Sequence, residues 1–399
     1  MKKAYNFFLA LFPILSGYGL SPSADFGSLL LLLFGLGCLC LYPSQFKLRF
    51  PIGYAPFLVV TVVLSILWSQ SIPLRLILFS VNLCLACSFS TYVDLWNYYR
   101  KIVLVCCVFF VIQEVSFLLL GSRPSGIFSF VPTIYGDNSS IKIEETILNT
   151  RSSSFFLEPS YFAQFLIPYV GICAFSQKVD ERKKAILVSI IVLLIRSGIG
   201  VILVGFIWLF WFFFGSAKKR AKLLAVVLAI VGIGILSYLG GSLVDYFMLR
   251  SEELLTYTGD EQYQSSGFIR FFRGYFVFAE VPTLNKIFGS SPGVVQSTLL
   301  NNELFWKVED HFINGFQTLL FHNGIIGAVL YLHHILLFPI KAKKKSIFVL
   351  TICIIVLLFG ESFYLCSRLF LITALLYLIT REEMTSNHKM ISPIYKAGD

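Results

Sequence analysis

Long apolar runs alternate with short polar segments along nearly the whole chain. A helix needs about 20 apolar residues, with roughly 17 as a practical lower bound, to cross a lipid bilayer. On this criterion the pattern predicts an all-α, polytopic membrane protein of about twelve transmembrane helices. The expected spans are residues 5–20, 26–42, 54–69, 73–91, 102–120, 156–177, 185–195, 198–215, 223–240, 313–338, 346–360 and 363–380.

Two of the apolar runs, 185–215 and 346–380, are too long for one crossing and short for two. Basic residues flank each run on both sides, so each run has to cross the membrane twice to keep its flanks on one face. The turns are expected at Arg196-Ser197-Gly198 and at Gly360-Glu361-Ser362.

Two polar intervals are too long to be tight turns. They are residues 121–155, the first extracytoplasmic loop, and residues 241–312, the large extracytoplasmic loop. No internal repeat or soluble domain stands out, so residues 1–399 are expected to form a single integral membrane domain.

Composition supports the membrane interpretation and restricts the partners. Hydrophobic residues make up 57% of the chain and charged residues 14%, against roughly 45–50% and about 25% in soluble domains. The net charge of +10 does not indicate nucleic acid, because the positive residues lie in short loops instead of on a soluble basic face. No nucleic-acid partner is expected.

The distribution of basic residues predicts the orientation. Twenty-one of the 32 lysines and arginines fall in segments that the twelve-span topology places on one side, and eight fall in the longer loops opposite. The positive-inside rule assigns the richer side, with both termini, to the cytoplasm. The sequence therefore predicts a multi-pass membrane protein with its two long loops outside the cytoplasm.

No cofactor or metal is expected. All nine cysteines fall within apolar runs, so a disulfide framework is not predicted and the pair Cys84 and Cys87 lacks further ligands nearby. The sequence also has no Walker motif and no HExxH motif, which argues against nucleotide-driven or zinc chemistry.

Six ionisable residues remain inside the apolar runs, each in the predicted extracytoplasmic half of its span or at an outer turn. They are Arg75, Glu114, Glu158, Arg196, Glu361 and Arg368. A charge at membrane depth costs at least about 2.5–3.5 kcal/mol, so such residues pair or face an interior cavity. Two interpretations stay open: arginine–glutamate pairs that hold helices together, or a polar cavity open to the outside.

The large loop contains a second basic feature. Arg270 and Arg273 are three residues apart and share one face if residues 267–280 are helical, with aromatic residues over much of the rest. Such a helix either anchors to anionic lipid or binds a phosphate through its guanidinium groups. The turn from Gly289 to Gly293 is expected to offer backbone N–H groups to the same anion.

These residues resemble the O-antigen polymerase (Wzy) family, which is related to the O-antigen ligases. The likeness in topology covers essentially the whole chain. The likeness in motif lies in four places: Arg151 to Phe162 with Glu158-Pro159, Ile195 to Gly198, Arg270 to Gly293, and Asn314 to Gly327.

The resemblance implies a GT-C-like architecture, a location in the bacterial inner (cytoplasmic) membrane, and a glycosyl transfer at the periplasmic face. In that reaction the growing glycan leaves undecaprenyl pyrophosphate for a hydroxyl of the next lipid-linked repeat unit. The implied partners are undecaprenyl pyrophosphate-linked oligosaccharides, membrane lipid and a chain-length regulator protein. A flippase for lipid-linked oligosaccharides and an O-antigen ligase stay as alternatives. Ile313 stands where the ligases have a histidine, which favours the polymerase.

Site residues follow from this resemblance and from their chemistry. The expected catalytic residues are Glu158, His311 and Arg196, and the expected substrate-binding residues are Arg151, Arg270, Arg273, Gly289, Gly293 and Asn314. Arginine cannot act as the base because its pKa exceeds about 12, so Glu158 is preferred as base and His311 is the second candidate. Glu158 before Pro159 is equally typical of a residue that begins a helix.

Overall fold

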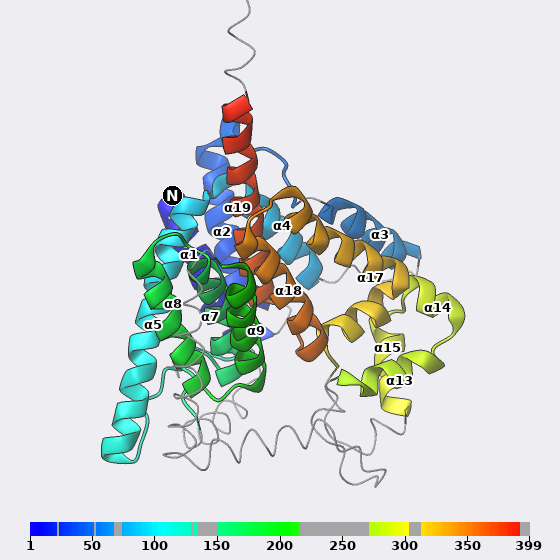
Figure 1. Cartoon of the computed structure of the whole chain (residues 1–399). Coiled ribbons are helices and arrows are strands. Elements are labelled where there is room, and N and C mark those ends of the chain that lie inside the picture. The colour runs from blue at the N-terminus through cyan, green and yellow to red at the C-terminus, as the bar shows by residue number, and fades with distance from the viewer. Residues whose placement is uncertain are drawn as a thin grey trace, which may run out of the picture.

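The computed structural model describes residues 1–21, 24–51, 53–67, 74–128, 131–134, 151–215, 271–302 and 313–391 (Figure 1). Within these ranges the predicted all-α class is confirmed: 14 α-helices account for the secondary structure apart from one 3-10 turn and one short hairpin. The hairpin pairs β1 (Gly19–Ser21) with β2 (Ala24–Asp25) and connects the first two helices.

The helices fall into two groups along the chain. The first group is α1 (Lys2–Leu15), α2 (Phe26–Leu41), α3 (Tyr54–Leu67), α4 (Leu74–Phe89), α5 (Tyr92–Leu120), α7 (Pro159–Ala174), α8 (Val179–Leu194) and α9 (Gly198–Phe214). The second group is α13 (Arg273–Glu280), α14 (Thr283–Phe288), α15 (Pro292–Asn301), α17 (Gly315–Lys341), α18 (Lys345–Gly360) and α19 (Ser367–Ile391).

Eleven of the twelve expected spans coincide with a helix, and the twelfth, 223–240, lies outside the described residues. By length and composition, two of the described helices are long and apolar enough to cross a membrane: α5 and α17. Five shorter apolar helices have 10–17 residues.

The two long apolar runs break where the flanking charges predict. The helix α8 ends at Leu194, and α9 begins at Gly198 with the Ser197 hydroxyl accepting the backbone N–H of Gly200. Between them Arg196 has a φ of 57°, a left-handed conformation that non-glycine residues adopt only where the surroundings hold them. The second run breaks after Gly360 and resumes at Ser367.

The helix α19 forms the centre of the core. From Leu369 to Ile379 its apolar side chains are buried on every side of the helix, which is typical of a helix surrounded by others. It packs against α1, α4, α5, α7, α17 and α18. By contrast, Leu118, Leu119 and Leu120 at the end of α5 are each at least 76% exposed.

Basic residues that are predicted to lie on the cytoplasmic side form hydrogen bonds between helices. Lys345 at the start of α18 donates to the backbone carbonyl of Phe214 at the end of α9. Arg381 on α19 donates to the carbonyls of Cys87 and Ser90 at the end of α4, both at 2.8 Å. The opposite ends of these helices therefore lie together at the other end of the bundle.

Candidate functional site

Residues 151–158, which precede α7, are hydrogen-bonded to α5. The side chain of Gln113 accepts the backbone N–H of Ser154 at 2.9 Å and donates to the carbonyl of Pro124 at 2.9 Å. The hydroxyl of Ser154 donates to the Cys106 carbonyl. Gly126 lies so close that an added Cβ would stand 1.9 Å from the Ser154 carbonyl oxygen. These contacts fix the direction in which residues 151–158 approach the bundle end.

We expect Gln113→Leu to lower the free energy of unfolding by about 2–3 kcal/mol, because Gln113 is fully buried and its loss leaves a backbone donor and a carbonyl unsatisfied. Thermal denaturation of the full chain in detergent measures the effect. Ser116→Ala on the same helix removes an exposed hydrogen bond to Ser122 and is the control, with an expected change within about 0.5 kcal/mol. Equal stability of the two variants would contradict this assignment.

Glu158 is the N-cap residue of α7, with extended backbone dihedrals. Its side chain makes no capping hydrogen bond to the helix backbone and instead accepts the Ser160 hydroxyl at 3.1 Å. The half-buried carboxylate thus stands at the helix start without a hydrogen bond to the helix backbone. It is accessible for proton transfer, which needs hydrogen-bond contact with the reacting group.

Arg151 and Arg196 are brought together. A guanidinium nitrogen of Arg151 donates to the backbone carbonyl of Arg196 at 3.2 Å. The side chain of Arg196 is exposed and lies on the turn into α9. One turn later, Gly200 packs closely on α7: a Cβ added to Gly200 would stand 2.9 Å from the Cβ of Ala163. We call Arg151, Glu158 and Arg196 the rim residues.

Arg273 does not lie on an exposed amphipathic face, and this corrects the prediction. It is 0% exposed and begins α13, whereas Phe272 and Phe276 beside it are 53% and 56% exposed. The reason is the docking of α13 on α17, where Gly274 is pressed against the Gln317 side chain and Gln317 donates to the Phe271 carbonyl. Arg270 lies outside the described residues, as does His311.

Asn314 is held by a helix cap. Its side chain accepts the backbone N–H of Gln317 at 2.8 Å, and the Gln317 side chain accepts the backbone N–H of Asn314 at 3.0 Å. The Asn314 amide also donates to the Phe359 carbonyl. These bonds are the reciprocal capping arrangement that begins a helix. Its substrate-binding role stays a prediction.

The glycine turn packs against a break in α17. Gly289 and Gly324 have φ values of 84° and 63°. An added Cβ on Gly289 would stand 2.3 Å from the His322 carbonyl oxygen, and one on Gly324 would stand 2.2 Å from the Ile287 carbonyl oxygen. The N–H groups of Gly289 and Ser290 already donate to Asn285 and Phe321. The turn therefore docks the large loop on α17, and anion binding at Gly293 stays a prediction.

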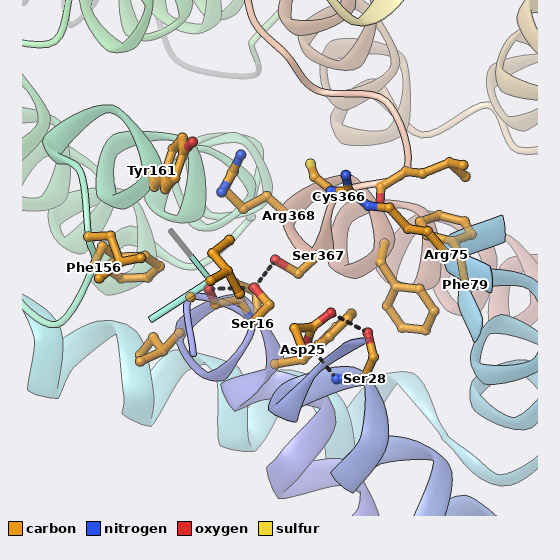
Figure 2. Close-up of a pocket in the computed structure, with 18 of the residues that line it drawn as sticks. Ser16, Asp25, Ser28, Arg75, Phe79, Phe156, Tyr161, Cys366, Ser367 and Arg368 are labelled. Atoms are coloured by element: carbon orange, nitrogen blue, oxygen red, sulfur yellow. Dashed lines mark hydrogen bonds between the residues drawn. The ribbon is translucent and has the colours of Figure 1, made fainter. Parts of the chain in front are cut away.

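A polar cavity of about 250 Å³ lies at the same end of the bundle (Figure 2). It is enclosed by the C-terminal end of α1 and by the N-terminal ends of α2, α4, α7 and α19. Its charged and hydrogen-bonding walls include Asp25, Arg75, Asn82, Tyr161, Ser367 and Arg368. Three neighbours of Glu158 on the chain, Phe156, Leu157 and Tyr161, also line it.

Half-buried Asp25 supplies the carboxyl group that lines this cavity. It accepts both the backbone N–H and the hydroxyl of Ser28 at 2.7 Å, and so caps α2. Burial raises the pKa of Asp25, while the Ser28 hydrogen bonds and the charge of Arg75 act in the opposite direction. Figure 2 shows the capping pair on one wall and a Ser16–Ser367 hydroxyl contact, at 2.5 Å, on another.

Two of the six ionisable residues expected at a cavity, Arg75 and Arg368, line this one. Glu114 instead pairs with Arg123 at 3.4 Å on the first loop, and the Glu361 carbonyl accepts the N–H of Gly315. Sequence reasoning missed Asp25, Asn82 and Tyr161. Asp25 before an apolar run was a usable signal because acidic residues favour helix starts.

Comparison with known proteins gives no match: neither a protein-family model, nor a curated protein, nor a solved structure is significantly similar to this chain.

Proposed function

We propose that this chain is a polysaccharide polymerase of the O-antigen type, embedded in the bacterial inner membrane with about twelve spans and both termini in the cytoplasm. Two observations at one end of the helical bundle carry the proposal: Arg151 contacts the Arg196 backbone, and a polar, arginine-containing cavity is lined by Phe156, Leu157 and Tyr161, the chain neighbours of Glu158. The positive-inside rule assigns that end to the periplasm.

The exposed apolar surface supports the membrane placement. Apolar side chains along α5, such as Leu104, Val108 and Leu118, are 64%, 52% and 80% exposed. An apolar face of this extent marks an interaction site on a soluble protein, and lipid chains would cover it in a bilayer. The contacts among basic residues fit the same placement, since Lys345 on α18 and Arg381 on α19 belong to segments assigned to the cytoplasm.

The chemistry proposed for the rim is a displacement at an anomeric carbon. The bond from that carbon to the pyrophosphate oxygen breaks, and a bond to the acceptor hydroxyl oxygen forms. The hydroxyl proton passes to the Glu158 carboxylate, and the electron pair leaves with the pyrophosphate. Arg196, with Arg151 beside it, stabilises the charge that develops on the leaving group, a contribution of roughly 3 kcal/mol for one well-placed donor.

The glycan phenotype of a deletion strain tests the proposal. A polymerase predicts lipopolysaccharide capped with a single repeat unit, and re-expression of the chain restores the long ladder. Naked core with lipid-linked polymer would indicate a ligase, and lipid-linked repeats retained on the cytoplasmic side would indicate a flippase. Either of these outcomes overturns the proposal.

A further inference from the structure

The cavity beside α7 is suited in size to one compact polar group. Its volume of about 250 Å³ is slightly below that of drug-sized ligand pockets, which are roughly 300–1,000 Å³. Five helices from four separate parts of the chain form its walls, so its shape is set by the packing of the bundle.

Two arginines supply positive charge from different elements. Arg368 is 9% exposed, and its guanidinium carbon lies 3.7 Å from the centroid of the Tyr161 ring, toward which it points in Figure 2. Arg75 lies on α4 and donates through Nε to the Leu365 carbonyl at 3.1 Å. That bond orients the side chain and leaves its terminal nitrogens for a ligand. Guanidinium groups favour carboxylate and phosphate oxygens.

The helix arrangement adds to this positive potential. The described N-terminal ends of α2, α4, α7 and α19 all border the cavity. The partial positive charge at a helix N-terminus favours an anion nearby. Among the described lining residues, the charged side chains are Arg75, Arg368 and Asp25, so positive charge exceeds negative charge.

Hydrogen-bond acceptors lie alongside the cations. Asn82 is 1% exposed and lines the cavity. Its amide nitrogen donates to the Ser28 carbonyl at 3.1 Å, but its Oδ1 has no partner among the described residues. A buried carbonyl oxygen of this kind favours a ligand that donates a hydrogen bond. The Asp25 carboxyl and the Ser16 and Ser367 hydroxyls offer further polar contacts.

We infer that the cavity binds a sugar residue carrying an anionic group, a carboxylate or a phosphate, with Arg75 and Arg368 on the anion and Asn82 on a sugar hydroxyl. The inference rests on the proposed function in one respect: such a residue would belong to the acceptor repeat unit. Tyr161 lies one turn of α7 after Glu158, so a sugar held in the cavity has its neighbouring unit near the proposed base.

Binding of soluble probes to the purified full chain in nanodiscs tests this inference. The probes are methyl glucuronide, glucose 6-phosphate, neutral methyl glucoside and inorganic phosphate, measured by saturation-transfer NMR. We expect an acidic sugar to bind at least 10-fold more tightly than methyl glucoside and than inorganic phosphate. The preferred acidic sugar identifies the anion as carboxylate or phosphate.

Variants locate the binding. Arg368→Gln and Arg75→Gln are each expected to weaken acidic-sugar binding at least 10-fold. Because the side chain of Arg75 is exposed, the Arg75→Gln variant is expected to fold. Lys183→Gln, which removes an exposed charge at the start of α8, is the matched control and leaves binding unchanged. Equal binding of methyl glucoside, equal binding of inorganic phosphate, or no effect of either arginine variant would overturn the inference.

The binding assay requires no turnover and no lipid-linked donor. It therefore tests the cavity assignment independently of the polymerase assignment. Absence of acidic-sugar binding in a chain that restores the ladder overturns the cavity assignment alone. Binding that depends on Arg75 and Arg368 in a chain whose deletion leaves the ladder intact overturns the polymerase assignment alone.

Discussion

Glu158→Gln is expected to abolish long-chain polymer while the chain still inserts and folds. The substitution keeps the shape of the side chain and its contact with Ser160 but removes the carboxylate that is proposed to accept the hydroxyl proton. Loss of a general base lowers rates by roughly 10²–10⁴-fold. Polymerisation of lipid-linked repeat units by the purified chain in proteoliposomes measures the rate, and the ladder length in cells provides a second readout.

Glu280→Gln is the matched control for this experiment. Glu280 is an exposed glutamate at the end of α13 that accepts the Asn302 amide at 2.8 Å, and its substitution is expected to leave the rate within about twofold, as for a surface change. A second comparison is His311→Ala, which is expected to be no more damaging than Glu158→Gln. A normal ladder with Glu158→Gln, or the reverse ranking, would move the base to another residue.

Gly324→Ala is expected to undock the large loop from α17 and to lower the free energy of unfolding by about 3 kcal/mol or more. The positive φ of 63° costs about 1–2 kcal/mol for a residue with a Cβ, and the overlap with the Ile287 carbonyl adds a packing cost of about 1–3 kcal/mol. Gly289→Ala is expected to have a similar effect. Thermal unfolding in detergent and protease cleavage between α14 and α15 report stability and docking.

Gly205→Ala controls for the loss of a glycine as such. Gly205 lies within α9 with open space around the position of a Cβ, so alanine there is expected to be neutral or stabilising by about 0.5–1 kcal/mol. If Gly324→Ala were as stable as Gly205→Ala, the close approach of the two backbones would not contribute to the fold.

The sequence predicts most of the helices because their signal is local. Apolar runs of sufficient length indicate helices in lipid, and flanking lysines and arginines set where long runs must turn, as at Arg196 and at Gly360. The pattern does not predict the residues at which the helices begin and end. The helix α1 ends at Leu15, before the expected end at residue 20, and α7 begins at Pro159, after the expected start at residue 156.

The site is less predictable because it depends on contacts between distant segments. The aromatic pattern around Arg273 is the same whether the arginine faces solvent or packs under α17, and only the docking through Gln317 decides it. Asn82 and Tyr161 are ordinary residues of apolar helices in the sequence. Only the folded structure shows that they line one cavity together with Arg368.

The way that the cavity is assembled has a consequence for the timing of biosynthesis. Its walls come from α1, α2, α4 and α7 and then from α19, the last described helix of the chain. A nascent chain lacks Ser367 and Arg368 until synthesis has passed them, so the cavity is closed only after the ribosome has translated the start of α19. A chain whose synthesis stops before α19 therefore lacks the cavity to which the binding of an acidic sugar is assigned above.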